Sequence, residues 1–106
     1  MMNSNQPLSQ QYLEAGHTWA RLDAAARMLE EGKTTYLAQQ KALLGDIADN
    51  KAEKQVKASA PWANYIKNMV NSKTEANKAK IDLEFVKMRF WEWQSDSANN
   101  RAGSKM

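Results

Sequence analysis

Two heptad patterns constrain the fold of this chain more than any other feature of its sequence. Apolar residues that recur at steps of three and four keep one stripe of a helix turned toward a partner helix. The first series contains Leu8, Tyr12, Ala15, Trp19, Leu22, Ala26, Leu29, Tyr36, Leu43 and Ile47, and the second contains Tyr65, Met69, Ser72, Ala76, Ala79, Leu83, Val86, Phe90 and Trp93. The sequence therefore predicts an all-α fold, an antiparallel, coiled-coil-like helical hairpin.

Start and stop signals divide this hairpin into segments of a single helical domain, 1–106. Pro7 suits the first turn of a helix, where its missing N–H needs no partner. Asn50 followed by Glu53 has the spacing of a capping box, and Ser59 followed by Pro61 predicts the start of another helix. The expected segments are a first arm over about 7–48, a connector helix over about 50–58, a second arm over about 61–98 and a flexible tail over 99–106.

Opposite charges on the two arms predict their register. Residues 1–53 carry five Lys or Arg against seven Asp or Glu, whereas residues 54–106 carry ten against five. One antiparallel alignment places Asp23 opposite Lys87 and Glu30 opposite Lys80. Exposed ion pairs contribute only about 0.2–1 kcal/mol each, so these pairs are expected to select the alignment more than to stabilise it.

The same alignment predicts the seam, by which we mean the interface between the two arms. Trp19 is expected to lie between Phe90 and Trp93, at the end away from the bend. The predicted seam comprises Trp19, Leu22, Leu29, Leu43, Ile47, Tyr65, Met69, Leu83, Val86, Phe90 and Trp93. Two helices packed only on each other bury a thin core for 106 residues, which favours dimerisation into a four-helix assembly.

The composition is typical of a soluble amphipathic protein. Hydrophobic residues make up 42% of the chain and charged residues 25%, and no apolar run approaches the roughly 20 residues of a membrane helix. The first ten residues, MMNSNQPLSQ, lack the basic and apolar regions of a secretory signal. Cysteine is absent, which excludes a disulfide framework and thiolate chemistry. We therefore expect a cytoplasmic protein without membrane contact.

The chain has no residue pattern typical of an enzyme. His17 is the only histidine, whereas zinc sites normally need several His or Cys ligands. Carboxylate pairs such as Glu30 and Glu31 have no apolar pocket to raise their pKa, so a solvated face is expected. Glycine-rich phosphate loops and nucleophile motifs are also absent. The sequence predicts a non-enzymatic protein with no cofactor, metal or small-molecule substrate.

A basic cluster near the predicted bend is a candidate nucleic-acid site. Lysines recur at every third position of the connector, and no matching run of acids accompanies them. Lysines bind phosphates and an aromatic ring stacks on a base, which is the chemistry of single-strand recognition. An ordinary solvated helix face is the alternative. The candidate residues are Lys51, Lys54, Lys57, Lys41, Lys67 and Trp62.

Two tryptophans near the end of the second arm indicate a protein interface. Residues two apart on a helix project in different directions, so Trp91 and Trp93 cannot both lie in the seam. With Trp93 in the seam, Trp91 faces outward beside Arg89 and Met88, and exposed tryptophans are frequent at interfaces. Self-association, binding of a foreign protein and coverage by the tail are three explanations for such an outward ring.

Several blocks of the chain resemble a group of small uncharacterised bacteriophage and prophage proteins. The blocks are E-A-N-K-A-K at 75–80, M-R-F-W-E-W at 88–93 and an Ala-Asn-x-Arg ending at 98–101, together with the first-arm segments T-W-A-R-L-D at 18–23 and M-L-E at 28–30. The resemblance implies a setting among early phage genes for DNA recombination, replication or host takeover, in the cytoplasm of a bacterial host. It implies no catalytic residues.

These observations predict a phage-type accessory protein that acts by binding DNA or a DNA-processing protein. The alternative hypothesis is an inhibitor that blocks a host defence or repair complex through protein contacts alone. A third hypothesis is a structural or assembly factor of the virion. A homo-oligomer is expected in each case.

Overall fold

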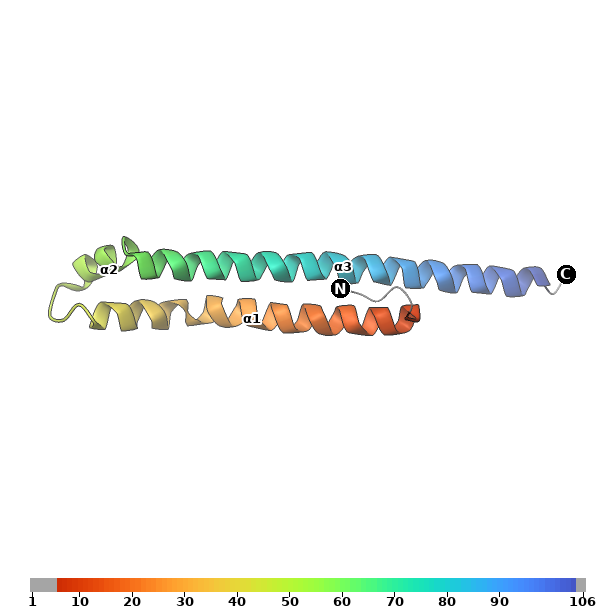
Figure 1. The fold of residues 1–106 in the computed structure, drawn as a ribbon, viewed down its shortest axis with the longest axis horizontal. Coiled ribbons are helices and arrows are strands. Elements are labelled where there is room, and N and C mark those ends of the chain that lie inside the picture. Colours follow the sequence, from red (N-terminus) through yellow and green to blue (C-terminus); the bar gives the residue numbers. More distant parts are fainter. Residues whose placement is uncertain (1–5, 105–106) are drawn as a thin grey trace.

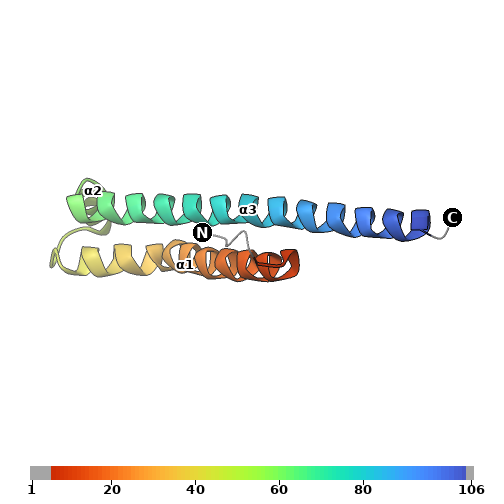
Figure 2. The same cartoon turned by 45° about the vertical axis from the view of Figure 1, so that its right-hand side comes forward.

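The structure is a long, narrow helical hairpin. It is a computed structural model that describes residues 6–104, with side chains through residue 100. The chain forms α1 (Leu8–Ala42), α2 (Asp49–Lys57) and α3 (Ala60–Ser104), and its extents are 83 × 22 × 15 Å. In two views α1 and α3 run side by side in opposite directions, and α2 lies at the end where the chain turns back (Figure 1, Figure 2). The predicted all-helical fold, with two long helices packed on each other, is confirmed.

The first helix ends earlier than expected. It stops at Ala42 rather than near residue 48, and the backbone N–H groups of Leu44 and Gly45 bond to carbonyls of its last turn. Gly45 has a φ of 81°, a left-handed conformation that glycine adopts without strain and that commonly follows a helix end. Leu43 and Ile47 therefore lie beyond α1, with exposed fractions of 78% and 36%, and their predicted places in the seam are wrong.

The starts of the second and third helices differ in how they are capped. Ala48 precedes α2 without a side-chain cap, and the Asn50 side chain accepts a bond from the N–H of Lys51 instead. The predicted capping box is therefore wrong, although α2 lies within one residue of the expected connector range at each end. The Ser59 hydroxyl accepts from the N–H of Trp62 at 3.4 Å, so the predicted serine cap of α3 is confirmed.

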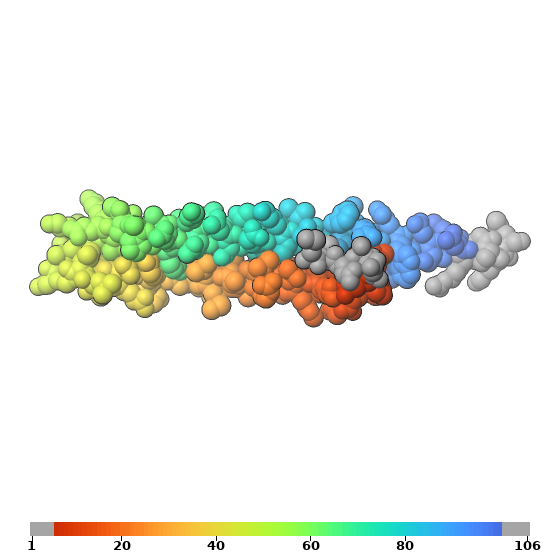
Figure 3. Space-filling view, in the orientation of Figure 1, coloured from red at the N-terminus to blue at the C-terminus, as the bar shows by residue number. Residues whose placement is uncertain are grey.

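The third helix is longer than expected. Residues 99–104, which we expected in the tail, continue α3 to Ser104, and residues 105–106 lie outside the described part of the chain. Because α1 starts only at Leu8, the last turns of α3 extend past it (Figure 1). Figure 3 shows the part of α3 drawn in blue projecting beyond the red start of α1.

Small residues bring the two long helices close together. Ala15 and Ala26 of α1 and Ala76 and Ala79 of α3 are all buried, as the heptad patterns predict. Among the residues with described side chains, Val86 is the largest that is fully buried, and it lies between the two helices. The centre of the hairpin is therefore a narrow alanine-rich seam, whereas the bulky aromatic side chains lie nearer its two ends.

The register of the helices differs from the predicted one by one heptad. Tyr12, rather than Trp19, contacts Phe90, with ring centroids 5.7 Å apart in an edge-on arrangement. Tyr36, rather than Leu43, stacks on Tyr65 at 4.4 Å. In both contacts the observed α1 residue is seven positions before the predicted one. The same faces of α1 and α3 therefore meet, but α1 is displaced along α3 by one heptad.

The predicted ion pairs between the arms do not form. Asp23 pairs with Arg27 of its own helix at 2.9 Å, not with Lys87. The ammonium of Lys80 lies over the ring of Trp19, 6.0 Å from its centroid, and not beside Glu30. Among the described residues no ion pair joins α1 to α3. Contacts other than ion pairs must therefore select the register.

An aromatic stack at the bend selects this register. Tyr36, Trp62 and Tyr65 lie nearly parallel, with Trp62 centred 6.3 Å from each tyrosine, and we call these three residues the aromatic stack. The Tyr65 hydroxyl donates a hydrogen bond to the Leu29 carbonyl of α1. A Cβ added at Gly32 would stand 3.2 Å from that hydroxyl, so the glycine makes room for the bond. These contacts fix α3 against one position of α1.

No helix in the described part of the chain is both long enough and apolar enough to cross a membrane.

Two glycines of α1 offer a test of the tyrosine contact. Gly16→Ala is expected to raise the free energy of unfolding by about 0.5–1 kcal/mol, because alanine favours a helix and its Cβ meets Leu83 at an ordinary 3.9 Å. Gly32→Ala is expected to leave the free energy of unfolding unchanged or to lower it, because the Tyr65 hydroxyl must shift to make room for the added Cβ. In a Tyr65→Phe background, Gly32→Ala should stabilise as much as Gly16→Ala. Urea unfolding followed by circular dichroism measures all three, and equal gains at both glycines in the native background would contradict the contact.

A second pair of substitutions distinguishes the observed register from the predicted one. Tyr36→Ala is expected to cost about 2 kcal/mol or more, because it removes the central contact of the aromatic stack. Leu43→Ala should change the free energy of unfolding by less than about 0.5 kcal/mol, because the side chain is 78% exposed. Thermal and urea unfolding measure both, and a larger loss for Leu43→Ala than for Tyr36→Ala would support the predicted register instead.

Candidate protein-binding surfaces

Four aromatic side chains gather where α1 begins beside α3. The Phe90 ring contacts Tyr12 edge-on, Trp91 edge-on at 6.2 Å and Trp93 at 6.1 Å with the rings tilted by 42°. We call Tyr12, Phe90, Trp91 and Trp93 the aromatic end. Because successive residues on a helix project about 100° apart, Trp91 and Trp93 flank Phe90 on opposite sides.

Both tryptophans of the aromatic end are more than half exposed. The exposed fraction is 56% for Trp91 and 54% for Trp93. Trp91 lies outside the seam as expected, but the prediction that Trp93 is a seam residue is wrong. The physical reason is the start of α1 at Leu8, which leaves too little of α1 to cover the Trp93 ring.

A groove beside Trp93 continues the aromatic end onto α1. It has a volume of about 350 Å³ and is lined by Pro7, Leu8, Ser9, Phe90 and Trp93. Its walls come from the first turn of α1 and the last aromatic turn of α3. Its volume and its mostly apolar walls lie within the range of clefts that bind ligand groups in proteins. The groove and the two exposed rings form a continuous candidate site for a protein partner.

The predicted cluster of Trp91, Arg89 and Met88 divides between two surfaces. The Arg89 guanidinium lies over the Phe85 ring, 5.9 Å from its centroid, and Met88 is 60% exposed. Met88 lines a second apolar groove of about 570 Å³ on α3, lined by Asn77, Lys80, Ile81, Glu84, Phe85 and Met88. Sequence reasoning missed this groove, although Ile81, Phe85 and Met88 repeat the steps of four and three that marked the seam.

The bend does not provide the predicted base-stacking site. Trp62 is only 9% exposed, because it packs in the aromatic stack between α1 and α3. A ring held in that way has no free face for a nucleotide base. The prediction that Trp62 contacts nucleic acid is therefore wrong.

The lysines near the bend are only partly available. Lys41 forms an ion pair with Asp49 at the start of α2, and Lys57 forms one with Glu53 at 3.0 Å. These two lysines therefore have acidic partners that the prediction did not give them. Lys51, Lys54 and Lys67 are exposed and belong to none of the ion pairs among the described residues.

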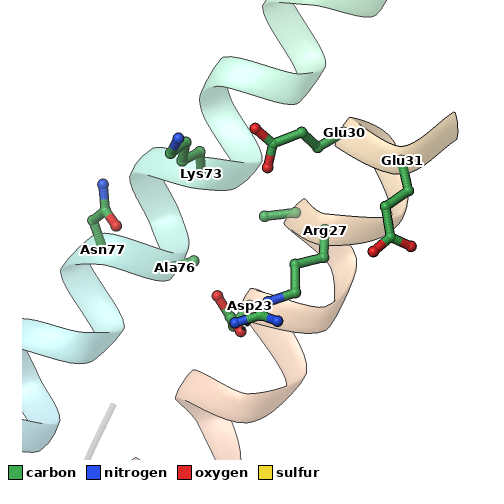
Figure 4. A pocket seen from close by; sticks show the side chains of 8 residues that line it. Asp23, Arg27, Glu30, Glu31, Lys73, Ala76 and Asn77 are labelled. Carbon is green, nitrogen blue, oxygen red and sulfur yellow. Dashed lines mark ion pairs between the residues drawn. The ribbon is translucent and has the colours of Figure 1, made fainter. Parts of the chain in front are cut away.

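A charged groove crosses the middle of the hairpin. Its volume is about 390 Å³, and its polar lining comes from Asp23, Arg27, Glu30 and Glu31 of α1 and Lys73 and Asn77 of α3. Figure 4 shows Arg27 turned back onto Asp23, while Glu30 extends from α1 toward the α3 backbone near Lys73. Acidic and basic groups alternate around an open, solvated space, which is not an environment that activates a carboxylate for catalysis.

Among the described residues, no group of three or more His, Cys, Asp or Glu side chains is arranged so that it could hold a metal ion. His17 is exposed on α1. Comparisons of the chain with protein families, curated proteins and solved structures find no match. The resemblance to phage and prophage proteins stays a prediction, and the geometry of the surfaces described above is what supports a functional inference.

Proposed function

We propose that this chain is a non-enzymatic binding protein and that its partner is another protein, held at the aromatic end. The observation that supports this proposal is the exposure of Trp91 and Trp93 on an ordered helix, beside the groove that Pro7 and Leu8 help to line. Large exposed aromatic rings on monomeric surfaces commonly mark interaction sites. The proposal retains the protein-binding half of the sequence-based hypothesis.

The geometry of the aromatic end suits a protein partner for two reasons. Trp91 and Trp93 are rigid side chains on a helix, so ordering them on binding costs little conformational entropy. Their contacts with Phe90 hold both rings in place before a partner arrives. Tryptophans in such positions often contribute about 2 kcal/mol or more each to an interface.

The class of partner is proposed from the sequence resemblance. Small phage and prophage proteins of the type that this chain resembles imply a setting in DNA metabolism or host takeover. We therefore propose a DNA-processing, repair or defence protein as the partner. Binding alone would then inhibit or redirect that protein, and no catalytic group of this chain is required.

Direct nucleic-acid contact at the bend is the second candidate function. It is supported by the exposure of Lys51, Lys54 and Lys67 without ion-pair partners among the described residues. Because Trp62 is buried, this contact would depend on charge alone, and charge contacts to phosphates recognise no base sequence.

Substitution of the exposed tryptophans tests the first candidate. The double variant Trp91→Ala/Trp93→Ala should reduce recovery of the specific partner from a lysate of the natural host cell by about tenfold or more, as measured by quantitative mass spectrometry of tagged-protein eluates. Leu13→Ala/Met28→Ala removes exposed apolar side chains from α1 and is the matched control, expected to retain the partner. Equal recovery with the tryptophan variant and the native chain would contradict the proposal.

Charge reversal at the bend tests the second candidate. Fluorescence anisotropy with labelled single- and double-stranded DNA should show binding that weakens as salt rises. Lys51→Glu/Lys54→Glu should abolish it, whereas Lys73→Glu/Lys78→Glu changes the net charge equally at another place on the hairpin and should have a smaller effect. The absence of binding by the native chain at low salt, or equal effects of the two variants, would remove this candidate.

A further inference from the structure

The third helix has a second apolar face that no part of the described chain covers. Ile81, Phe85 and Met88 are 68%, 56% and 60% exposed and line the larger of the two apolar grooves. Helical periodicity directs them away from Ala79 and Val86, which are buried against α1. Three large apolar side chains in steps of four and three form half of a coiled-coil contact.

We propose that a second copy of this chain docks on this face in antiparallel orientation, with the two α3 helices paired. In this pairing Phe85 of each copy lies opposite Met88 of the other. A twofold pair of this kind uses the same patch on both copies, so the patch must complement itself in shape and charge. The charges that flank the face meet this requirement.

Asp82 and Arg89 lie along one edge of the apolar face, seven residues apart. When Phe85 is placed opposite Met88 of an antiparallel copy, Asp82 falls opposite Arg89 of that copy, and the symmetry forms this pair twice. Neither residue belongs to an ion pair among the described residues of a single chain. The Arg89 guanidinium already lies over Phe85, at the edge of the proposed contact.

Other alignments of the same face bring like charges together. A parallel pair would place Lys78 against Lys78 and Glu92 against Glu92, whereas the antiparallel pair places Glu92 opposite Ile81, about one turn from Lys78. A shift of the antiparallel pair by one heptad would place Asp82 against Asp82. Like charges in such positions are destabilising, so the charge pattern favours one orientation and one register.

The proposed dimer leaves Trp93 and its groove free. Trp93 and its groove lie toward α1, away from the face that contains Phe85, so both copies retain this site. The twofold axis passes near residues 86 and 87, which places the two aromatic ends close to the centre of the dimer. The two bends then lie about 80 Å apart, because α3 rises about 1.5 Å per residue.

Charge reversal and its compensation test this dimer. In sedimentation equilibrium, Asp82→Arg and Arg89→Asp should each raise the dimer dissociation constant by about tenfold, because each creates two repulsive pairs. The double variant Asp82→Arg/Arg89→Asp should restore the native dissociation constant to within about threefold, because it re-forms both pairs with reversed charges. Phe85→Glu should give a monomer.

Controls separate loss of the dimer from loss of the fold. Met28→Glu adds a charge at an exposed apolar position of α1 and should leave the dissociation constant unchanged. Circular dichroism of each variant should match that of the native chain. A native chain that remains monomeric up to about 1 mM, single reversals without effect, or a double variant as weak as the single ones would each overturn the proposed pairing. None of these results depends on the protein partner at the aromatic end.

Discussion

The aromatic stack at the bend is the contact on which the rest of the hairpin depends. Tyr36 of α1 stacks on Tyr65 of α3, and the Tyr65 hydroxyl reaches the Leu29 carbonyl beside Gly32. Two straight helices with a heptad seam can slide along each other in steps of seven residues at little cost in apolar burial. The stack is the contact that singles out one of these steps, and it thereby decides where α1 begins against α3 and which rings are left exposed at the far end.

Much of the fold could be predicted because amphipathic periodicity is a local property. The heptad stripes correctly marked Ala15, Ala26, Ala76, Ala79 and Val86 as buried. The register could not be predicted in the same way, because a shift of one heptad preserves every stripe. Charge pairing between the arms predicts the wrong alignment, since exposed ion pairs are weak compared with aromatic packing. The burial of Trp62 depends on tertiary packing against Tyr36, which no local pattern reveals.

The candidate sites were predicted only in part, for a related reason. The outward position of Trp91 followed from helical geometry, but the exposure of Trp93 depends on where α1 starts once the register is set. Ile81, Phe85 and Met88 form a third periodic stripe in the sequence, but this stripe is short and lies on the same helix as the longer stripe of the seam. The third helix has apolar residues on two opposite faces, and the hairpin covers one of them; the other is the face on which we propose that a second copy docks.

Cysteine cross-linking of the two long helices tests the observed register most directly, because the native chain has no cysteine. Ala26 and Ala76 are buried on facing helices and line one groove, so Ala26→Cys/Ala76→Cys should form an intramolecular cross-link under oxidation. Ala26→Cys/Leu83→Cys, which samples the alignment one heptad away, should not. Cross-linking at a dilution where the chain is monomeric excludes bonds between copies. Efficient intramolecular cross-linking of the second pair, with none of the first, would contradict the register set by the aromatic stack.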